Sequence, residues 1–90
     1  MNKRKDIVPN NLREYRLKAG LTQKQVANML GFASEERISH WENGNNVPSL
    51  INLFKLSNIY RATPFHLYEE VLNKTQDELA IVREKDMKDD

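Results

Sequence analysis

Glycines divide the first half of this chain into short segments, and their spacing constrains the fold strongly. The chain has three glycines, at positions 20, 31 and 44. Each follows a segment whose apolar side chains recur at three- and four-residue intervals, which is the period of a helix. Glycine is favoured just after the last turn of a helix. The spacing therefore predicts a series of short helices joined by tight links.

Residues that favour helix starts stand where these segments begin. The candidates are Asn10 or Asn11, the capping box Thr22 to Gln25, Ser34, Pro48-Ser49, and Thr63 before Pro64. The expected apolar sets are Leu12 and Tyr15; Val26, Ala27 and Leu30; Ile38 and Trp41; Leu50, Leu53, Phe54, Leu56 and Ile59; and Phe65, Leu67, Tyr68 and Val71. Because no strand pattern or repeat is visible, an all-α fold of five short helices is predicted.

The segment after Leu72 allows two interpretations. Thr75 to Glu78 has the pattern of a second capping box and can start a new helix, or the fifth helix can continue through it. A 3–4 spacing, which can form a short seam, links Leu72, Thr75, Leu79 and Val82. Residues 85–90 are expected to fray. The chain is thus divided into a basic arm (1–8), a helical domain (9–72) and an acidic tail (73–90) that is a candidate dimer or partner contact.

Composition excludes several classes of protein. The chain has no cysteine, which excludes disulfide and thiolate chemistry. Neither a signal peptide nor an apolar run long enough for a membrane span is visible, so a cytoplasmic protein is expected. Neither a nucleophile with a paired base nor a glycine-rich phosphate loop is present, and His66 has no partner at metal-ligand spacing. We therefore expect no enzyme, no cofactor and no metal.

The net charge of +1 hides an asymmetry. Residues 1–68 hold ten Lys/Arg and five Asp/Glu, whereas residues 69–90 hold four Lys/Arg and eight Asp/Glu. A basic body with an acidic tail suits a polyanionic partner for the body alone, although ordinary surface variation gives the same pattern.

The segment from Leu21 to Glu42 has the form of a helix-turn-helix. Residues 23–30 and 35–43 are the expected helices, and Gly31 to Ser34 is the turn between them. The inner faces are apolar, and Ala27 is small where the helices approach each other. The outer face of the second helix is polar and carries Glu36, Arg37, Ser39 and His40. Such a helix fits the major groove of DNA.

Several strings of residues in order resemble the Cro/repressor-type (XRE-family) helix-turn-helix. They are Leu21-Thr22-Gln23-Lys24-Gln25-Val26-Ala27, Leu30-Gly31, Ile38-Ser39-His40-Trp41-Glu42-Asn43-Gly44 and Pro48-Ser49-Leu50. The resemblance covers roughly residues 12 to 68. It implies a compact, lambda-repressor-like five-helix domain, here with a C-terminal helical extension. It also implies a transcriptional regulator that binds double-stranded DNA at near-palindromic operators as a homodimer.

The resemblance also implies which residues contact DNA. The glutamine matching Gln23 touches a phosphate, the start and outer face of the second helix read bases or phosphates, and the following loop approaches the DNA backbone. The candidate DNA-binding residues are Gln23, Lys24, Ser34, Glu35, Glu36, Arg37, Ser39, His40, Asn43, Asn45 and Asn46. Charge for phosphate binding is also available on Lys3, Arg4, Lys5 and Arg13.

This sequence departs from the family pattern in two ways. The segment from Gly31 to Ile38 is one residue longer than the commonest spacing, which shifts the start of the second helix. Glu35 and Glu36 stand where many relatives have glutamine, arginine or lysine. A glutamate can accept from cytosine but is repelled by phosphates, so modest affinity or a restricted site is expected.

Several residues have more than one interpretation. Arg37 can bond guanine, clamp a phosphate or pair with Glu36 or Glu42. The phase of Trp41 with Ile38 favours core packing over base stacking. The basic residues Lys3 to Lys5 either form an arm that follows the DNA or only keep the chain terminus soluble. The asparagines after the second helix either contact the DNA backbone or only form a turn.

A second function stays open beside DNA-binding regulation. The seam from Leu72 to Val82 also suits an antitoxin-like module that binds a partner protein through its tail. The two functions overlap, because antitoxins of this family commonly repress their own operons.

Overall fold

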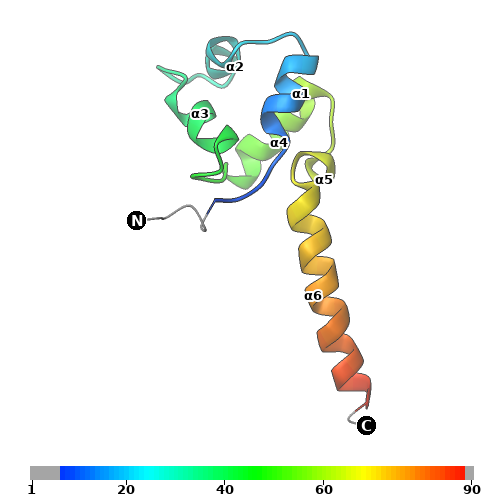
Figure 1. Cartoon of the computed structure of the whole chain (residues 1–90). Coiled ribbons are helices and arrows are strands. Elements are labelled where there is room, and N and C mark those ends of the chain that lie inside the picture. Colours follow the sequence, from blue (N-terminus) through cyan, green and yellow to red (C-terminus); the bar gives the residue numbers. More distant parts are fainter. Residues whose placement is uncertain (1–6, 89–90) are drawn as a thin grey trace.

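The chain folds into a helical body from which one long helix projects (Figure 1). The computed structural model describes residues 7–88 and contains no strand within that range. Its helices are α1 (Leu12–Lys18), α2 (Gln23–Met29), α3 (Glu36–Glu42), α4 (Leu50–Tyr60), α5 (Pro64–Leu67) and α6 (Glu69–Lys88). The predicted all-α fold, with five short helices and a C-terminal helical extension, is confirmed.

Three helices begin at the caps that the sequence predicts. The Gln25 N–H donates to the Thr22 hydroxyl at 3.0 Å, and the Thr22 N–H donates to the Gln25 side-chain oxygen at 2.9 Å. The hydroxyls of Ser49 and Thr63 each accept from the backbone N–H three residues further on. These contacts satisfy N–H groups that have no partner within the first turn of a helix.

The start of α3 differs from the prediction by one residue. Its N-cap is Glu35, which makes no side-chain cap hydrogen bond, so Ser34 is not the cap and Glu35 is not in the first turn. The Ser34 hydroxyl instead accepts from the Glu36 N–H at 3.4 Å. The longer turn lets Ser34 satisfy an N–H of the first turn from one position outside the helix.

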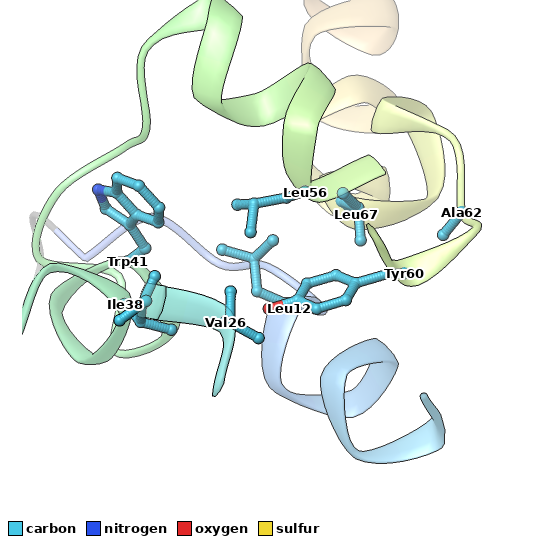
Figure 2. Close-up of a cluster of buried hydrophobic side chains, with 9 residues drawn as sticks. Leu12, Val26, Ile38, Trp41, Leu56, Tyr60, Ala62 and Leu67 are labelled. Atoms are coloured by element: carbon cyan, nitrogen blue, oxygen red, sulfur yellow. The ribbon is translucent and has the colours of Figure 1, made fainter. Parts of the chain in front are cut away.

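The core lies among α1 to α5 (Figure 2). Its buried apolar residues are Leu12, Val26, Ala27, Ile38, Trp41, Leu56, Tyr60, Ala62 and Leu67. Trp41 is 4% exposed, which confirms that it packs in the core.

The predicted burial was wrong for Leu50, Phe54 and Phe65, which are 64%, 47% and 66% exposed. Leu50 is the first residue of α4, and Phe54 lies off the face that the buried Leu56 and Tyr60 turn inward.

The tail is one continuous helix with the end of the body. α6 runs through Thr75, whose hydroxyl donates to the Leu72 carbonyl at 2.8 Å rather than capping a new helix. The expected fraying from residue 85 is not seen up to Lys88, and residues 89–90 lie outside the described range. Every side chain from Asn73 to Met87 is exposed. Over residues 7–88, no helix combines the length and apolarity that crossing a membrane requires.

The segment before α1 packs against the C-terminal end of α3. The Val8 N–H donates to the Gly44 carbonyl at 2.9 Å, and the Asn10 side-chain amide donates to the Trp41 carbonyl at 2.9 Å. The Asn10 side-chain oxygen also accepts from the Leu12 N–H at 3.0 Å, which orders the start of α1. Of the predicted basic arm (1–8), residues 1–6, which include the cations at positions 3–5, lie outside the described residues.

Gly44 is expected to tolerate no side chain. Its φ is +81°, and an added Cβ would meet the Ile7 side chain and lie 2.7 Å from the Val8 oxygen. The backbone strain alone costs about 1–3 kcal/mol. Gly31→Ala is the matched control, because Gly31 has a φ of +79° but nothing within 4 Å of an added Cβ. In urea unfolding, Gly44→Ala should lose more stability than Gly31→Ala, and equal losses would contradict the contact with residues 7 and 8.

Burial of Tyr68 predicts a loss of stability in alkali. Its hydroxyl oxygen is buried and has no hydrogen-bond partner among the described residues, and burial raises the pKa of Tyr68 from 10.0 to about 12. The folded state holds the Tyr68 proton more tightly than the unfolded state does, so the protonated side chain contributes to the free energy of unfolding. This contribution is complete below pH 10 and decreases as the pH rises towards 12. Tyr68→Phe should weaken this alkaline decrease and leave stability at pH 7 unchanged or higher, by up to about 1 kcal/mol. A clear destabilisation at pH 7 in chemical denaturation would contradict it.

Candidate nucleic-acid interface

The second and third helices form the predicted helix-turn-helix. α2 and α3 contact each other, and the side chains that they bury in the common core are Val26, Ala27, Ile38 and Trp41. Ala27 is 0% exposed, which is consistent with a small residue where the helices approach closely. The turn between them covers residues 30–35, and the outer face of α3 remains open to solvent.

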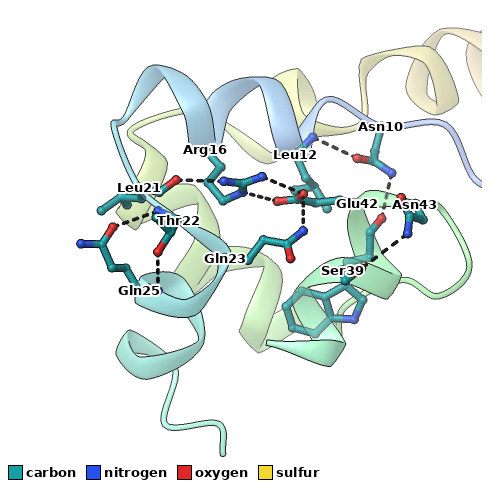
Figure 3. Close-up of polar contacts among 11 residues, drawn as sticks. Asn10, Leu12, Arg16, Leu21, Thr22, Gln23, Gln25, Ser39, Glu42 and Asn43 are labelled. Atoms are coloured by element: carbon teal, nitrogen blue, oxygen red, sulfur yellow. Dashed lines mark hydrogen bonds and ion pairs between the residues drawn. The ribbon is translucent and has the colours of Figure 1, made fainter. Parts of the chain in front are cut away.

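A buried ion pair ties α1 to α3 (Figure 3). The Arg16 guanidinium donates to the Glu42 carboxylate, with Nε 2.6 Å from Oε2 and Nη2 3.1 Å from Oε1. The exposed fractions of the two side chains are 9% and 3%. The hydrogen bond to Glu42 raises the pKa of Arg16, so the guanidinium stays charged. Bidentate geometry of this kind fixes both position and orientation.

Gln23 joins the same network. Its side-chain amide donates to Glu42 Oε1 at 2.9 Å, so the first residue of α2 is held against the last residue of α3. Arg16 also donates to the Leu21 carbonyl at 2.9 Å, which fixes the approach to α2. Sequence reasoning selected Gln23 but missed Arg16 and the structural role of Glu42. No local pattern connects Arg16 and Glu42, which lie 26 positions apart.

Arg37 lies on an aromatic surface. Its guanidinium carbon is 4.0 Å from the centre of the Phe32 ring and 5.7 Å from that of Trp41. The two rings pack edge to face at 5.8 Å. Among the described residues no ion pair forms with Arg37, so the alternative of pairing with Glu36 or Glu42 is not seen. Cation–π contact therefore orients the guanidinium of the exposed Arg37 where α3 meets the preceding turn.

The remaining polar side chains of α3 and the loop after it form a continuous surface. His40 Nε2 lies 3.6 Å from the Glu36 carboxylate, and the Asn43 side-chain amide is 3.5 Å from the Ser39 hydroxyl. The backbone N–H of Asn45 donates to the His40 carbonyl at 2.9 Å, so the loop folds back on the helix end. The exposed residues of the candidate set are Lys24, Ser34, Glu35, Glu36, Arg37, Asn43, Asn45 and Asn46, while Gln23, Ser39 and His40 are half-buried.

His66 lies apart from this surface. Its ring Nδ1 is 3.1 Å from the Thr63 hydroxyl, and the ring stacks on Tyr15 with 6.4 Å between centres. These contacts assign His66 to the junction of α1 and α5.

Comparison with known proteins agrees with this geometry. A sequence model of the family described as "Helix-turn-helix" matches residues 12–67. The chain belongs to the Cro/repressor-type (XRE) helix-turn-helix family. It is therefore a helix-turn-helix DNA-binding protein of the transcription-regulator type. A search of curated proteins found no match.

A solved structure of another protein has a similar fold. It is described as the crystal structure of a "putative DNA-binding protein from Bacteroides fragilis". The two sequences are 28% identical, and the structures superpose with a TM-score of 0.59. The match covers 64% of this chain and 92% of the other.

Proposed function

We propose that this family member regulates transcription by binding a near-palindromic operator as a homodimer in the cytoplasm. The observation that carries the proposal is the orientation of Arg37 on Phe32 and Trp41, at the exposed face of α3. A helix in the major groove reads base edges with side chains from this face. A guanidinium held in one place can donate two hydrogen bonds to guanine, the commonest specific contact in DNA recognition.

The residues around Arg37 divide into base-reading and positioning groups. Glu36, Arg37, Ser39 and His40 occupy the outer side of α3 and face base edges or nearby phosphates in the proposed complex. Contacts to phosphates fix register without reading sequence. We assign these contacts to Gln23, Lys24, Ser34, Asn43, Asn45 and Asn46, whereas the carboxylate of Glu35, like that of Glu36, can only accept from a base.

The acidic start of α3 favours selectivity over affinity. Glu35 and Glu36 are exposed beside the proposed groove, where phosphates repel carboxylates. A DNA site of another sequence leaves both carboxylates without a hydrogen-bond donor. A site with a correctly placed cytosine N4 group can donate to one of them. We therefore expect weak binding to random DNA.

A dimer follows from the small size of the reading helix. α3 has seven residues, so one copy can reach only a few base pairs. Two copies related by a two-fold axis read two half-sites, and their operator shares that symmetry.

We also propose that the chain divides into an N-terminal arm (1–8), a DNA-binding domain (9–72) and a tail (73–90).

Substitution of Arg37 tests its assigned role. Arg37→Ala should weaken binding to the selected operator by about 1–3 kcal/mol, because a bidentate base contact is lost, and should leave the fold intact. Arg37→Lys is the matched control, since lysine keeps the charge but loses the planar pair of donors. Gel-shift titrations on operator and on random DNA measure both effects. If lysine restores full affinity and selectivity, Arg37 contacts only phosphate.

A second candidate function uses the tail. The exposed apolar side chains of α6, including Leu79, Ile81 and Val82, also suit an antitoxin-like module that binds another protein. Deletion of residues 73–90 separates the two functions. Loss of the dimer, with a corresponding loss of operator affinity, supports the homodimer. An unchanged dimer and unchanged operator binding favour the partner-binding module.

A further inference from the structure

α6 carries an apolar stripe that is open to solvent beyond the end of the helical body. Leu79 and Val82 are 63% and 54% exposed, and Leu72 is half-buried at the end of the body. With Thr75 these residues recur at three- and four-residue intervals, so they share one face of the helix. We call Leu72, Thr75, Leu79 and Val82 the α6 stripe.

The projecting part of α6 lacks support from the body. All side chains from Asn73 to Met87 are exposed, and the helix extends away from the other elements (Figure 1). Isolated helices of about 12–15 residues are marginal in water, because most helical stability in proteins comes from packing of an apolar face. A partner along the stripe would supply that packing.

We propose that the α6 stripes of two copies pack together as a short parallel two-stranded coiled coil. This inference rests on the homodimer proposed above and assigns its contact surface. With Leu72 and Leu79 at the a positions, Thr75 and Val82 occupy the d positions of the heptad. The next a position is Asp86, where like charges would face each other, so the seam ends after Val82.

Charge complementarity identifies a second copy as the occupant. In this register Glu78 falls at position g and Arg83 at position e of the following heptad. These two positions face each other across a parallel pair, so each copy's Glu78 meets its partner's arginine, twice by symmetry. A surface that complements itself is what a two-fold dimer requires.

The DNA-binding face selects the parallel orientation. A parallel pair places both helical bodies at the same end of the coiled coil, where two α3 helices can reach one duplex. An antiparallel pair places the bodies at opposite ends of a structure in which a single chain already extends 54 Å. Its g positions would also face each other, so that Glu78 would meet Lys85 rather than Arg83.

Sedimentation of the 90-residue chain without DNA tests the surface. The wild type should show a concentration-dependent dimer, and Leu79→Asp should weaken dimerisation more than about tenfold, because it places a charge in the seam. Ile81→Asp is the matched control, since Ile81 is 60% exposed on the same helix but lies off the stripe. It should remain dimeric, and circular dichroism confirms that both variants are folded.

Exchange of the flanking charges tests the orientation. Glu78→Arg and Arg83→Glu should each weaken the dimer through repulsion, and the double variant should restore it. In an antiparallel pair the double variant would not be restored, because the introduced arginine would face Lys85. A dimer that Arg83→Glu does not weaken, or that the double variant does not restore, would therefore overturn the parallel arrangement.

Two further results would overturn the inference. A dimer that survives Leu79→Asp but dissociates with Ile51→Ser would place the contact on α4, where Ile51 is 62% exposed, and would leave the homodimer proposal intact. A wild-type protein that stays monomeric at all concentrations and on operator DNA would contradict the homodimer itself. The two failures are thus distinguishable.

Discussion

Replacement of Glu42 with alanine is expected to lower the free energy of unfolding by about 3–5 kcal/mol. The substitution leaves the guanidinium of Arg16, whose side chain is 9% exposed, buried without a counter-ion. It also removes the acceptor of the Gln23 amide, so α1, α2 and the end of α3 lose their common contact. Urea unfolding of the single variant measures the loss. A loss below about 1 kcal/mol would show that the pair behaves like an exposed surface bridge.

A double substitution separates stability from positioning. In Arg16→Met/Glu42→Leu neither charge remains, so most of the stability should return, because burying two charges is itself costly. The Gln23 side chain still lacks its acceptor in this variant. Operator affinity should therefore remain reduced even where stability is restored, and full recovery of both would show that the network has no role in binding.

Replacement of Trp41 with alanine is expected to cost about 3–5 kcal/mol, as for other buried tryptophans. The side chain is 4% exposed and packs edge to face on Phe32 at 5.8 Å. Its loss also removes part of the aromatic surface that orients Arg37. Thermal or urea unfolding should show the loss, and operator binding should decrease with it.

Trp41→Phe is the conservative control. It keeps an aromatic ring in the core, so it should lose clearly less stability than alanine and retain most DNA binding. If Trp41→Ala instead left the fold stable and abolished only binding, the tryptophan would lie in the DNA interface and the assigned rotation of α3 would be wrong.

The parts predicted correctly from the sequence depend on local physics. Thr22, Ser49 and Thr63 bond to groups within three residues, so their capping role is visible in the sequence. The phase of Trp41 with Ile38 likewise indicates the buried face of α3. One start was wrong by a residue, because Ser34 can satisfy the Glu36 N–H from outside the helix.

The parts that sequence reasoning missed depend on tertiary contacts. Arginine side chains are usually exposed, and only the packing of α1 against α3 makes Arg16 a buried partner of Glu42. Phe32 was considered only as part of the turn, whereas in the structure it positions Arg37. Periodicity alone also overestimated the buried face of α4, since Leu50 and Phe54 are exposed.

Selection from a random duplex library tests the central claim most directly. The wild-type protein should enrich a two-fold-symmetric site with half-sites about one helical turn, or a multiple of it, apart. Its affinity for that site should decrease steeply as the salt concentration rises. Recovery of no enriched sequence, or of a single asymmetric half-site bound by a monomer, would contradict sequence-specific binding by a homodimer.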